Sequence, residues 1–531
     1  METIGNDGQG RRHSMRDPAA AAKLLAELRG ADAIKALDDL TGWLRELDQT
    51  PAADDAAHAG ILALIQETGI PHASAALAPF LLRPADRPKG HDAAWPSLTS
   101  YLAASSRALC DSALRLSKAA TSDPSTQNEA AAGAARALNE CRRLAKTSLV
   151  RHLAVPADVW REAYAVHRGA EAAQCSTLAV RMHGEDRTTT TVEQELLRLL
   201  MLAVSSPEMM TPGQIEVADW AGEHVGGEFT LRPPGVADNP FCFDPAGDAP
   251  PHRAPASQER DSGGELRYFG PGIGYEALGR IYKQMGTSSS VDIKASGKAI
   301  APHVQLSAVQ HLLVFWGEKP AYTPPGRTPA ASTVQVVRGY SQTWQQLSRA
   351  KTGLGELTLA ADGDVPLQPP ESWALHDTGG NELGVQVAQA SADAVHCGDV
   401  VAVSGAAKGE WWLALVRALH AEAGHVMHAS LFILSRDPQA VQIRMVIPKG
   451  EESGITEQAA RQFSYAGVHA IIVSDGSGKS QANLLLPPEI WKEGRAFELA
   501  TPAGPRYLRC GRMLRHGDDY VRATFDWMQP A

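Results

Sequence analysis

The chain has 531 residues, of which 44% are hydrophobic and 21% charged, and its formal net charge is −10 at pH 7. This length is too great for one hydrophobic core and predicts roughly two to four domains. The mild negative charge excludes the broad basic surface with which proteins bind nucleic-acid polymers.

The first elements of the sequence indicate where the protein resides. Residues 1–18 contain basic side chains without an apolar stretch behind them, which predicts a disordered leader rather than a secretory signal. No segment reaches the roughly twenty apolar residues of a membrane helix, so we expect no membrane insertion. Six cysteines lie far apart without CxxC spacing, which favours reduced thiols over disulfides or a zinc site. These features predict a cytoplasmic protein.

Residues 19–230 have the apolar spacing of amphipathic helices. Apolar side chains recur every three or four positions from Ile34 to Leu47, and comparable runs follow at 56–66, 98–119, 128–153, 159–180 and 192–204. Polar or proline-containing breaks such as Thr50-Pro51 separate the runs. Short connections favour antiparallel neighbours, so this segment predicts an α-helical bundle or solenoid.

The remaining sequence is predicted to contain four further segments. Residues 231–264 are rich in proline, glycine and aspartate and predict a linker, and residues 265–330 predict a helical connector with helices at 275–284 and 303–316. Residues 331–447 alternate apolar and polar side chains, including the whole run Thr333–Leu347, and predict an antiparallel β-barrel. Residues 448–531 predict a second small β unit. The predicted fold class is therefore α+β and multidomain.

A histidine-rich stretch could support metal chemistry. His420, Glu422, His425 and His428 would lie on two strands of one hairpin, with His420 opposite His428. The spacing matches none of the familiar metal motifs, so a polar strand face is the preferred interpretation and no metal site is predicted.

Several framework residues of the β-rich module follow a recognisable order. Trp373 stands before an aspartate-containing turn, Gly398-Asp399 leads into a valine pair, and a strand runs from Trp411 to Arg417. This order resembles the PilZ domain, a bacterial receptor module for cyclic di-GMP. Trp160, Tyr164 and a leucine-rich run ending in a Ser-Ser-Pro turn resemble the helical extension of larger bacterial PilZ proteins.

The ligand-binding motifs of this family are degenerate here. The PilZ pattern has an RxxxR motif before the first strand, where this sequence has Arg327 but Thr323 in place of the partner arginine. It also has a [D/N]xSxxG motif, where this sequence has Asp377, then Gly379 at the serine position and Glu382 at the glycine position. A shift of the alignment by two, at the cost of an insertion, would put Gly384 at the glycine position instead. Glutamate beside an anionic ligand would repel it.

The resemblance nevertheless implies a cyclic di-GMP site. Arg327 would bind a phosphate or stack on a guanine, because a planar guanidinium can do both. Asp377 and the backbone of Gly379 and Gly380 would meet the other edge of the ligand. The simpler interpretation is that Arg327 and Asp377 form an ordinary surface ion pair.

Three functional hypotheses follow. The leading one is a non-enzymatic bacterial signalling or regulatory adaptor with a PilZ-like domain, which has a protein partner, responds to cyclic di-GMP and uses no other cofactor. The first alternative is a ligand-free protein-interaction scaffold with a degenerate PilZ fold. The second alternative is a metal-dependent hydrolase that uses the histidines at 420–428.

Overall fold

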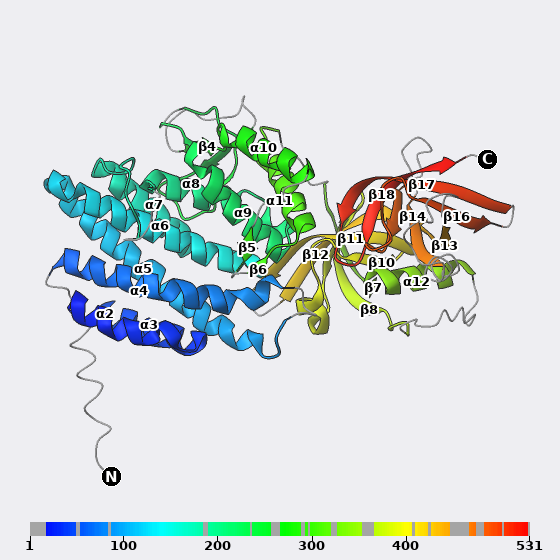
Figure 1. Cartoon of the computed structure of the whole chain (residues 1–531), viewed down its shortest axis with the longest axis horizontal. Helices are drawn as coiled ribbons and strands as arrows, with labels where there is room; N and C mark the ends of the chain where they lie inside the picture. The colour runs from blue at the N-terminus through cyan, green and yellow to red at the C-terminus, as the bar shows by residue number, and fades with distance from the viewer. Residues whose placement is uncertain are drawn as a thin grey trace, which may run out of the picture. The chain divides into compact units, whose positions relative to one another are not determined.

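The computed structural model describes residues 17–48, 54–82, 87–183, 189–233, 236–255, 266–287, 293–295, 298–319, 326–352, 366–405, 409–422, 426–446, 467–473, 483–501 and 504–528. The chain divides into two compact units, residues 1–322 and 323–531. The first is coloured from blue to green in Figure 1 and the second from yellow-green to red. The predicted leader lies almost wholly outside the described residues.

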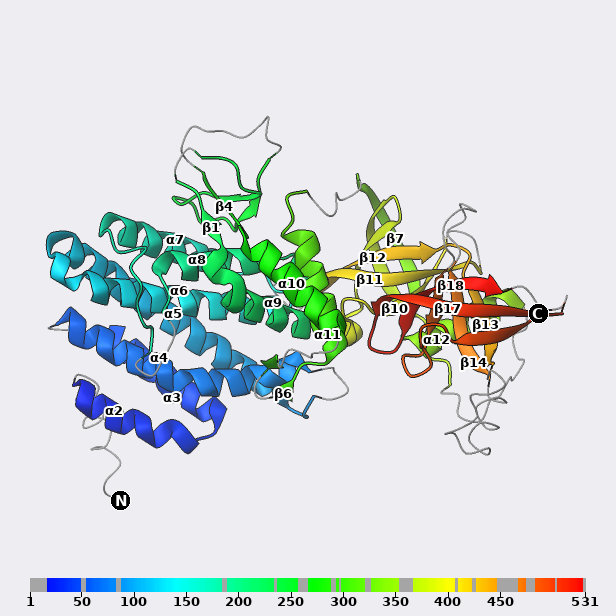
Figure 2. The same cartoon turned by 45° about the horizontal axis from the view of Figure 1, so that its top comes forward.

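The first unit is built from helices that run beside one another. Its α-helices are α2 (Pro18–Ala26), α3 (Ala33–Asp48), α4 (Asp55–Leu77), α5 (Ala94–Ser122), α6 (Gln127–Val150), α7 (Ala157–Ala172), α8 (Val192–Ala203), α9 (Pro212–Val225), α10 (Gly274–Thr287) and α11 (Pro302–Phe315). The long helices α3 to α6 lie side by side in both views (Figures 1 and 2), and one hydrophobic core extends from Ala21 to Trp316. Among the described residues, no helix is long and apolar enough to cross a bilayer.

Local sequence explains where two of these helices begin. The side chains of Thr191 and Thr211 each accept a hydrogen bond from the backbone N–H of the glutamine three positions on. The side-chain oxygens of these glutamines, Gln194 and Gln214, accept from the backbone N–H of the threonines. This reciprocal capping box satisfies N–H groups that a helix start would otherwise leave open. It fixes the starts of α8 and α9, which pack against α6.

The segment expected to be a linker contains part of a small sheet. Its strands are β1 (Thr230–Leu231), β2 (Phe241–Phe243), β3 (His252–Arg253) and β4 (Arg267–Gly270), in the order β1-β4-β2-β3. Phe241 and Phe243 are buried and join the core of the helical unit. Each of these strands has only two to four residues, too few to show an alternating apolar pattern among the surrounding prolines and glycines. The sequence therefore indicated a linker. A two-stranded hairpin, β5 (Lys294–Ala295) and β6 (Lys298–Ala299), precedes α11.

The second unit contains two closed antiparallel barrels. The first has the strand order β10-β11-β12-β9-β8-β7, and the second has the order β13-β14-β15-β18-β17-β16. The strands of the first are β7 (Thr328–Arg338), β8 (Glu371–Gly379), β9 (Glu382–Gln386), β10 (Val400–Ser404), β11 (Trp411–Glu422) and β12 (Val426–Ser435). Those of the second are β13 (Gln439–Met445), β14 (Val468–Val473), β15 (Asn483–Leu486), β16 (Ala496–Thr501), β17 (Gly504–His516) and β18 (Val521–Met528). The predicted α+β class, helical first and β-barrel second, is confirmed.

One predicted strand is partly a helix. The run Thr333–Leu347 was expected to be extended throughout, but β7 ends at Arg338 and α12 (Tyr340–Thr352) follows. Gly339 makes the change of direction with a φ of +82°, which a residue with a side chain rarely adopts. In α12 the buried apolar residues Tyr340, Trp344 and Leu347 are spaced with a helical period and lie on one face.

Helix α12 joins the two barrels into one unit. Tyr340, Trp344 and Leu347 pack in a cluster with outward side chains of the first barrel and with Ile471, Val473, Leu485 and Tyr520 of the second. The Trp344 indole donates to the Val441 carbonyl at 3.0 Å and stacks on His469 at a centroid distance of 3.6 Å. β13 lies within the segment expected to complete the first barrel, yet it pairs with β14 and β16 of the second.

Candidate functional site

Arg327 and Asp377 meet on the outside of the first barrel. Arg327 directly precedes β7, and Asp377 lies near the end of β8, where Pro329 is its partner in register. The Arg327 Nη1 donates to the Asp377 Oδ1 at 2.7 Å, and the side chains are 35% and 29% exposed. The structure thus brings together two residues that the resemblance placed in one site, in a geometry that a surface ion pair also has.

Glu382 lies beneath this pair and is almost fully buried. Its side chain is 3% exposed. Its neighbours Leu383 and Val385 face the barrel core, so strand alternation places Glu382 on the outer face. Its Oε1 accepts from the Arg417 Nη1 at 2.6 Å, and its Oε2 accepts from the Arg327 Nη2 at 3.3 Å. A charge at this depth needs cationic partners, and a guanidinium faces each of its two oxygens.

Arg417 and Ser430 complete the cluster and were not expected from the sequence. The Ser430 Oγ lies 3.3 Å from the Arg327 Nη2 and 3.4 Å from the Glu382 Oε2. Arg417 follows Val416, which faces the barrel core, so strand alternation places Arg417 on the outer face, next to an irregularity in the pairing of β11 with β12. Alternation along the Trp411–Arg417 strand was a usable signal for the outward position of Arg417. Its contact with Glu382 was not visible, because Glu382 lies on another strand.

The two glycines of the predicted site have different surroundings. A Cβ on Gly379 would lie 2.6 Å from the carbonyl oxygen of Gly326, so the chain before β7 passes directly against this residue. Gly380 has a φ of +58° in the turn between β8 and β9, and its carbonyl accepts from the Arg436 Nη2 at 3.5 Å. Their proposed contact with a ligand stays a prediction.

The cluster is electrically balanced. Two guanidinium groups, of Arg327 and Arg417, face two carboxylates, of Asp377 and Glu382. The Arg417 guanidinium also lies 5.3 Å from the centroid of the Phe432 ring. The arrangement offers planar cations to an anion, but each cation already has a carboxylate partner.

The histidine-rich hairpin does not form a metal site within the described residues. His420 and His428 do face each other across β11 and β12, and the His428 Nε2 lies 3.4 Å from the Glu422 Oε1. His425 lies outside the described residues. No group of three His, Cys, Asp or Glu side chains in the described part of the chain is placed to hold a metal ion.

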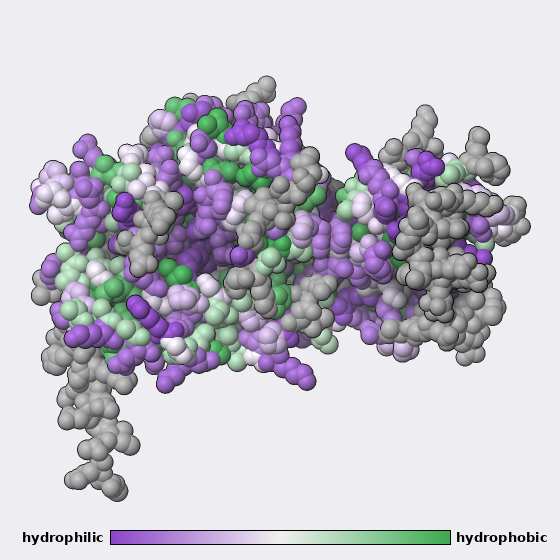
Figure 3. All heavy atoms as spheres, viewed as in Figure 1, coloured by the Kyte–Doolittle hydropathy of each residue, from purple (hydrophilic) through white to green (hydrophobic). Residues whose placement is uncertain are grey.

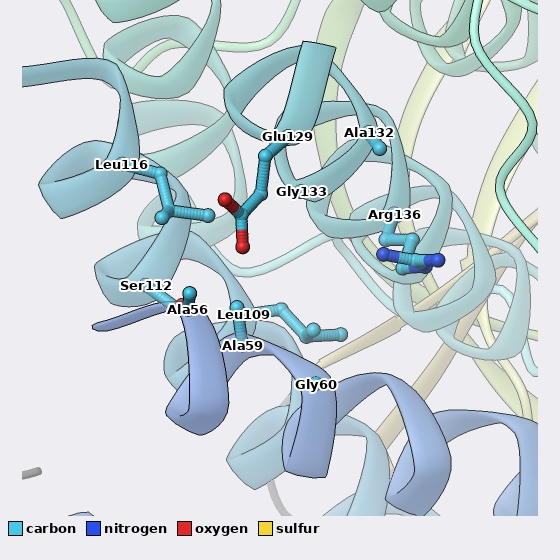
Figure 4. Close-up of a pocket in the computed structure, with 10 residues that line it drawn as sticks. All are labelled: Ala56, Ala59, Gly60, Leu109, Ser112, Leu116, Glu129, Ala132, Gly133 and Arg136. Carbon is cyan, nitrogen blue, oxygen red and sulfur yellow. The ribbon is translucent and has the colours of Figure 1, made fainter. Parts of the chain in front are cut away.

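The helical unit contains a cavity that is too small for a dinucleotide. It has a volume of about 120 Å³ and lies among α4, α5 and α6. Figure 4 shows Glu129 and Arg136 from α6 and Ser112 from α5 around it, with small residues on the facing turn of α4. Drug-sized ligands occupy pockets of about 300–1,000 Å³.

A second pocket of the helical unit, between α3 and α5, has a volume of about 300 Å³, at the lower end of that range, and is lined by Asp48 and Arg107 among others. Figure 3 shows hydrophilic and hydrophobic residues interspersed on one face of the molecule. The charge cluster on the first barrel is kept as the candidate site because it contains the predicted residues Arg327 and Asp377.

Comparison with known proteins found one similarity, in the first unit. Residues 19–234 match the model of a family described as the N-terminal domain of the cyclic-di-GMP receptor FimW. The match covers the helices α2 to α9 and ends before most of the small sheet. Comparisons with curated proteins and with solved structures gave no match.

Proposed function

We propose that this protein is a cyclic di-GMP-responsive signalling adaptor and that the ligand binds on the outer face of the first barrel, around Arg327. The observation that carries the proposal is the match of residues 19–234 to the N-terminal domain of a cyclic-di-GMP receptor. A receptor's N-terminal domain is accompanied here by a closed antiparallel barrel, in which Arg327 and Asp377 are in contact. The proposal treats this barrel as PilZ-like.

The chemistry of the cluster supports a phosphate-containing ligand. Arg327 and Arg417 lie on the same outer face, and guanidinium groups can fork onto phosphate oxygens and stack on bases. In the proposed role the protein binds the ligand without breaking a covalent bond and is a non-enzymatic regulator. The helical unit supplies the surface for a protein partner in a bacterial cytoplasm, and the barrel supplies the response to the ligand.

Calorimetry with the full-length protein tests the proposal. We expect cyclic di-GMP to bind at micromolar concentrations and Arg327→Ala to weaken binding at least about tenfold, because a charge-assisted hydrogen bond to phosphate is lost. Arg509→Ala is the matched control, because Arg509 is an exposed arginine on β17 of the second barrel. Absent binding, or binding that both variants leave unchanged, contradicts the proposed site.

A ligand-free interaction scaffold is the second candidate, and one observation favours it. Asp377 and Glu382 already satisfy the Arg327 guanidinium, as in a structural ion-pair network. In that case the partners captured by the full-length protein would be the same with and without cyclic di-GMP, and the same for Arg327→Ala. A partner set that changes with the ligand would rule this candidate out.

A further inference from the structure

Glu382 occupies the position between two arginines that an anionic ligand would need. Its two carboxylate oxygens each accept from a different guanidinium, Oε1 from Arg417 at 2.6 Å and Oε2 from Arg327 at 3.3 Å. A phosphodiester likewise presents two acceptor oxygens with one negative charge shared between them. The carboxylate and a ligand phosphate therefore require the same donors.

The burial of Glu382 makes this competition strong. The side chain is 3% exposed, whereas Arg327 is 35% exposed and Arg417 is 24% exposed. Ligand can thus approach the outer side of the arginines while the carboxylate holds them from below. In the ion pairs that the structure shows among the described residues, two unit positive charges balance two unit negative charges. A phosphate that entered without displacing a carboxylate would add unbalanced negative charge to these pairs.

Asp377 is the weaker of the two internal anions. It is 29% exposed, and the structure shows Arg327 as its cationic partner. Glu382, in contrast, bridges both arginines and also lies 3.4 Å from the Ser430 hydroxyl. Glu382 is therefore the group whose contacts set the cost of freeing both arginines together.

We propose that Glu382 is a built-in competitor, a tethered carboxylate that must release Arg327 and Arg417 before the phosphates of cyclic di-GMP can bind. The inference rests on the proposed function and adds how its affinity is regulated. When only a fraction of the molecules has the arginines free, the apparent dissociation constant is raised by the inverse of that fraction. The glutamate thus sets the concentration at which the protein responds.

The test is the affinity of full-length Glu382→Gln for cyclic di-GMP. Glutamine keeps the size and one acceptor oxygen of the side chain but removes its charge. We expect the dissociation constant to fall about tenfold or more, because the variant populates the binding-competent state more often. Glu371→Gln is the matched control, because Glu371 is a partly exposed carboxylate on the same barrel that accepts from Arg338 at 2.9 Å and not from Arg327. The affinity of Glu371→Gln for cyclic di-GMP should equal that of the unchanged protein.

The outcomes separate the inference from the proposed function. Tighter binding by Glu382→Gln, or binding that appears only in this variant, supports the inference. Unchanged or weaker binding by Glu382→Gln, when binding by the unchanged protein is lost with Arg327→Ala, overturns the inference and leaves the proposed function standing. Absence of binding in both proteins overturns both.

A structure of the unchanged protein with cyclic di-GMP provides a test that does not depend on the stability of a variant. A phosphate on Arg327, with the Glu382 carboxylate moved beyond ion-pair distance of that guanidinium, is the expected result. A phosphate on Arg327 beside an intact Glu382–Arg327 contact would overturn the inference.

Discussion

At the scale of single residues, the ion pairs in the charge cluster on the first barrel differ in how much they should contribute to stability. The Arg327–Asp377 pair is partly exposed, and such pairs contribute roughly 0–1 kcal/mol. The Arg417–Glu382 pair joins a half-buried guanidinium to a carboxylate that is 3% exposed. The two arginines therefore differ in what their loss should cost.

We expect Arg417→Ala to destabilise the protein more than Arg327→Ala. Removal of Arg417 leaves the Glu382 carboxylate with its weaker, 3.3 Å partner, and an under-satisfied buried charge costs about 1–3 kcal/mol. Removal of Arg327 keeps the 2.6 Å bond to Arg417 and should cost less than about 1 kcal/mol. Urea unfolding of the full chain, followed by tryptophan fluorescence, measures both. Equal losses of stability would contradict this ranking.

The sequence predicted part of this cluster. Arg327 and Asp377 could be paired because the PilZ resemblance assigns them to one ligand. Glu382 was recognised only as a charge that would repel an anion, and its bonds to two arginines depend on burial. The contact of Arg417 with Glu382 depends on how β9 and β11 are both paired with β12, which the sequence of one strand does not show.

At the scale of elements, α12 has the largest structural role that the sequence did not indicate. The alternation in Thr333–Arg338 is that of a strand, and it continues into a segment whose apolar side chains recur every three or four residues. Gly339 separates the two periods. Because only three large apolar residues of α12 are buried, tertiary packing between two barrels stabilises it more than intrinsic propensity does.

We expect Trp344→Ala to uncouple the barrels. The side chain is 6% exposed, donates to the Val441 carbonyl and stacks on His469, and loss of a buried tryptophan costs about 3–5 kcal/mol. Trp344→Phe is the graded control, because it keeps an aromatic ring but removes the N–H and should cost less. Hydrogen exchange should show faster opening of β13 and β14 and unchanged protection of α5 and α6. Uniform loss of protection in both units would contradict a local role.

At the scale of the whole molecule, the division into a helical and a β-rich unit was visible in the period of the apolar residues. The sequence could not place the start of the second barrel, because β13 and β12 both alternate and only pairing assigns β13 to the second barrel. Short strands inside the proline-rich segment were likewise lost among turn residues. The remaining domain boundaries stay predictions.

Three buried titratable groups, two in the first unit and one in the second, contribute to the acid response with opposite signs. Burial alone would raise the pKa of Asp219, but the charges of Arg142 and Lys146 outweigh it and lower the pKa from 3.8 to about 2. Burial also lowers the pKa of His167 from 6.5 to about 4. In the second unit, burial raises the pKa of Asp519, although the Tyr340 backbone N–H donates to its carboxylate.

The signs of these shifts predict that the helical unit loosens first as the pH falls. In the unfolded chain His167 becomes protonated below pH 6.5, whereas in the folded unit it stays neutral down to about pH 4. The folded unit therefore loses stability as the pH falls across that interval. Asp219 contributes stability above pH 3.8 that disappears as the pH falls to about 2. Asp519 contributes most at low pH, and its contribution is lost as the pH rises through its folded pKa. Acid therefore removes support from the first unit but not, through Asp519, from the second.

Hydrogen-exchange protection measured from neutral to acidic pH, corrected for the intrinsic exchange rate, tests this order. Protection in α6, α7 and α9 should decline at a higher pH than protection in the barrels. His167→Gln removes the upper titration, so this variant should lose little stability between pH 6.5 and about 4. Earlier opening of the barrels, or a variant with the same acid profile as the unchanged protein, would show that other groups control the response, because the burial of His167 would then have no energetic consequence.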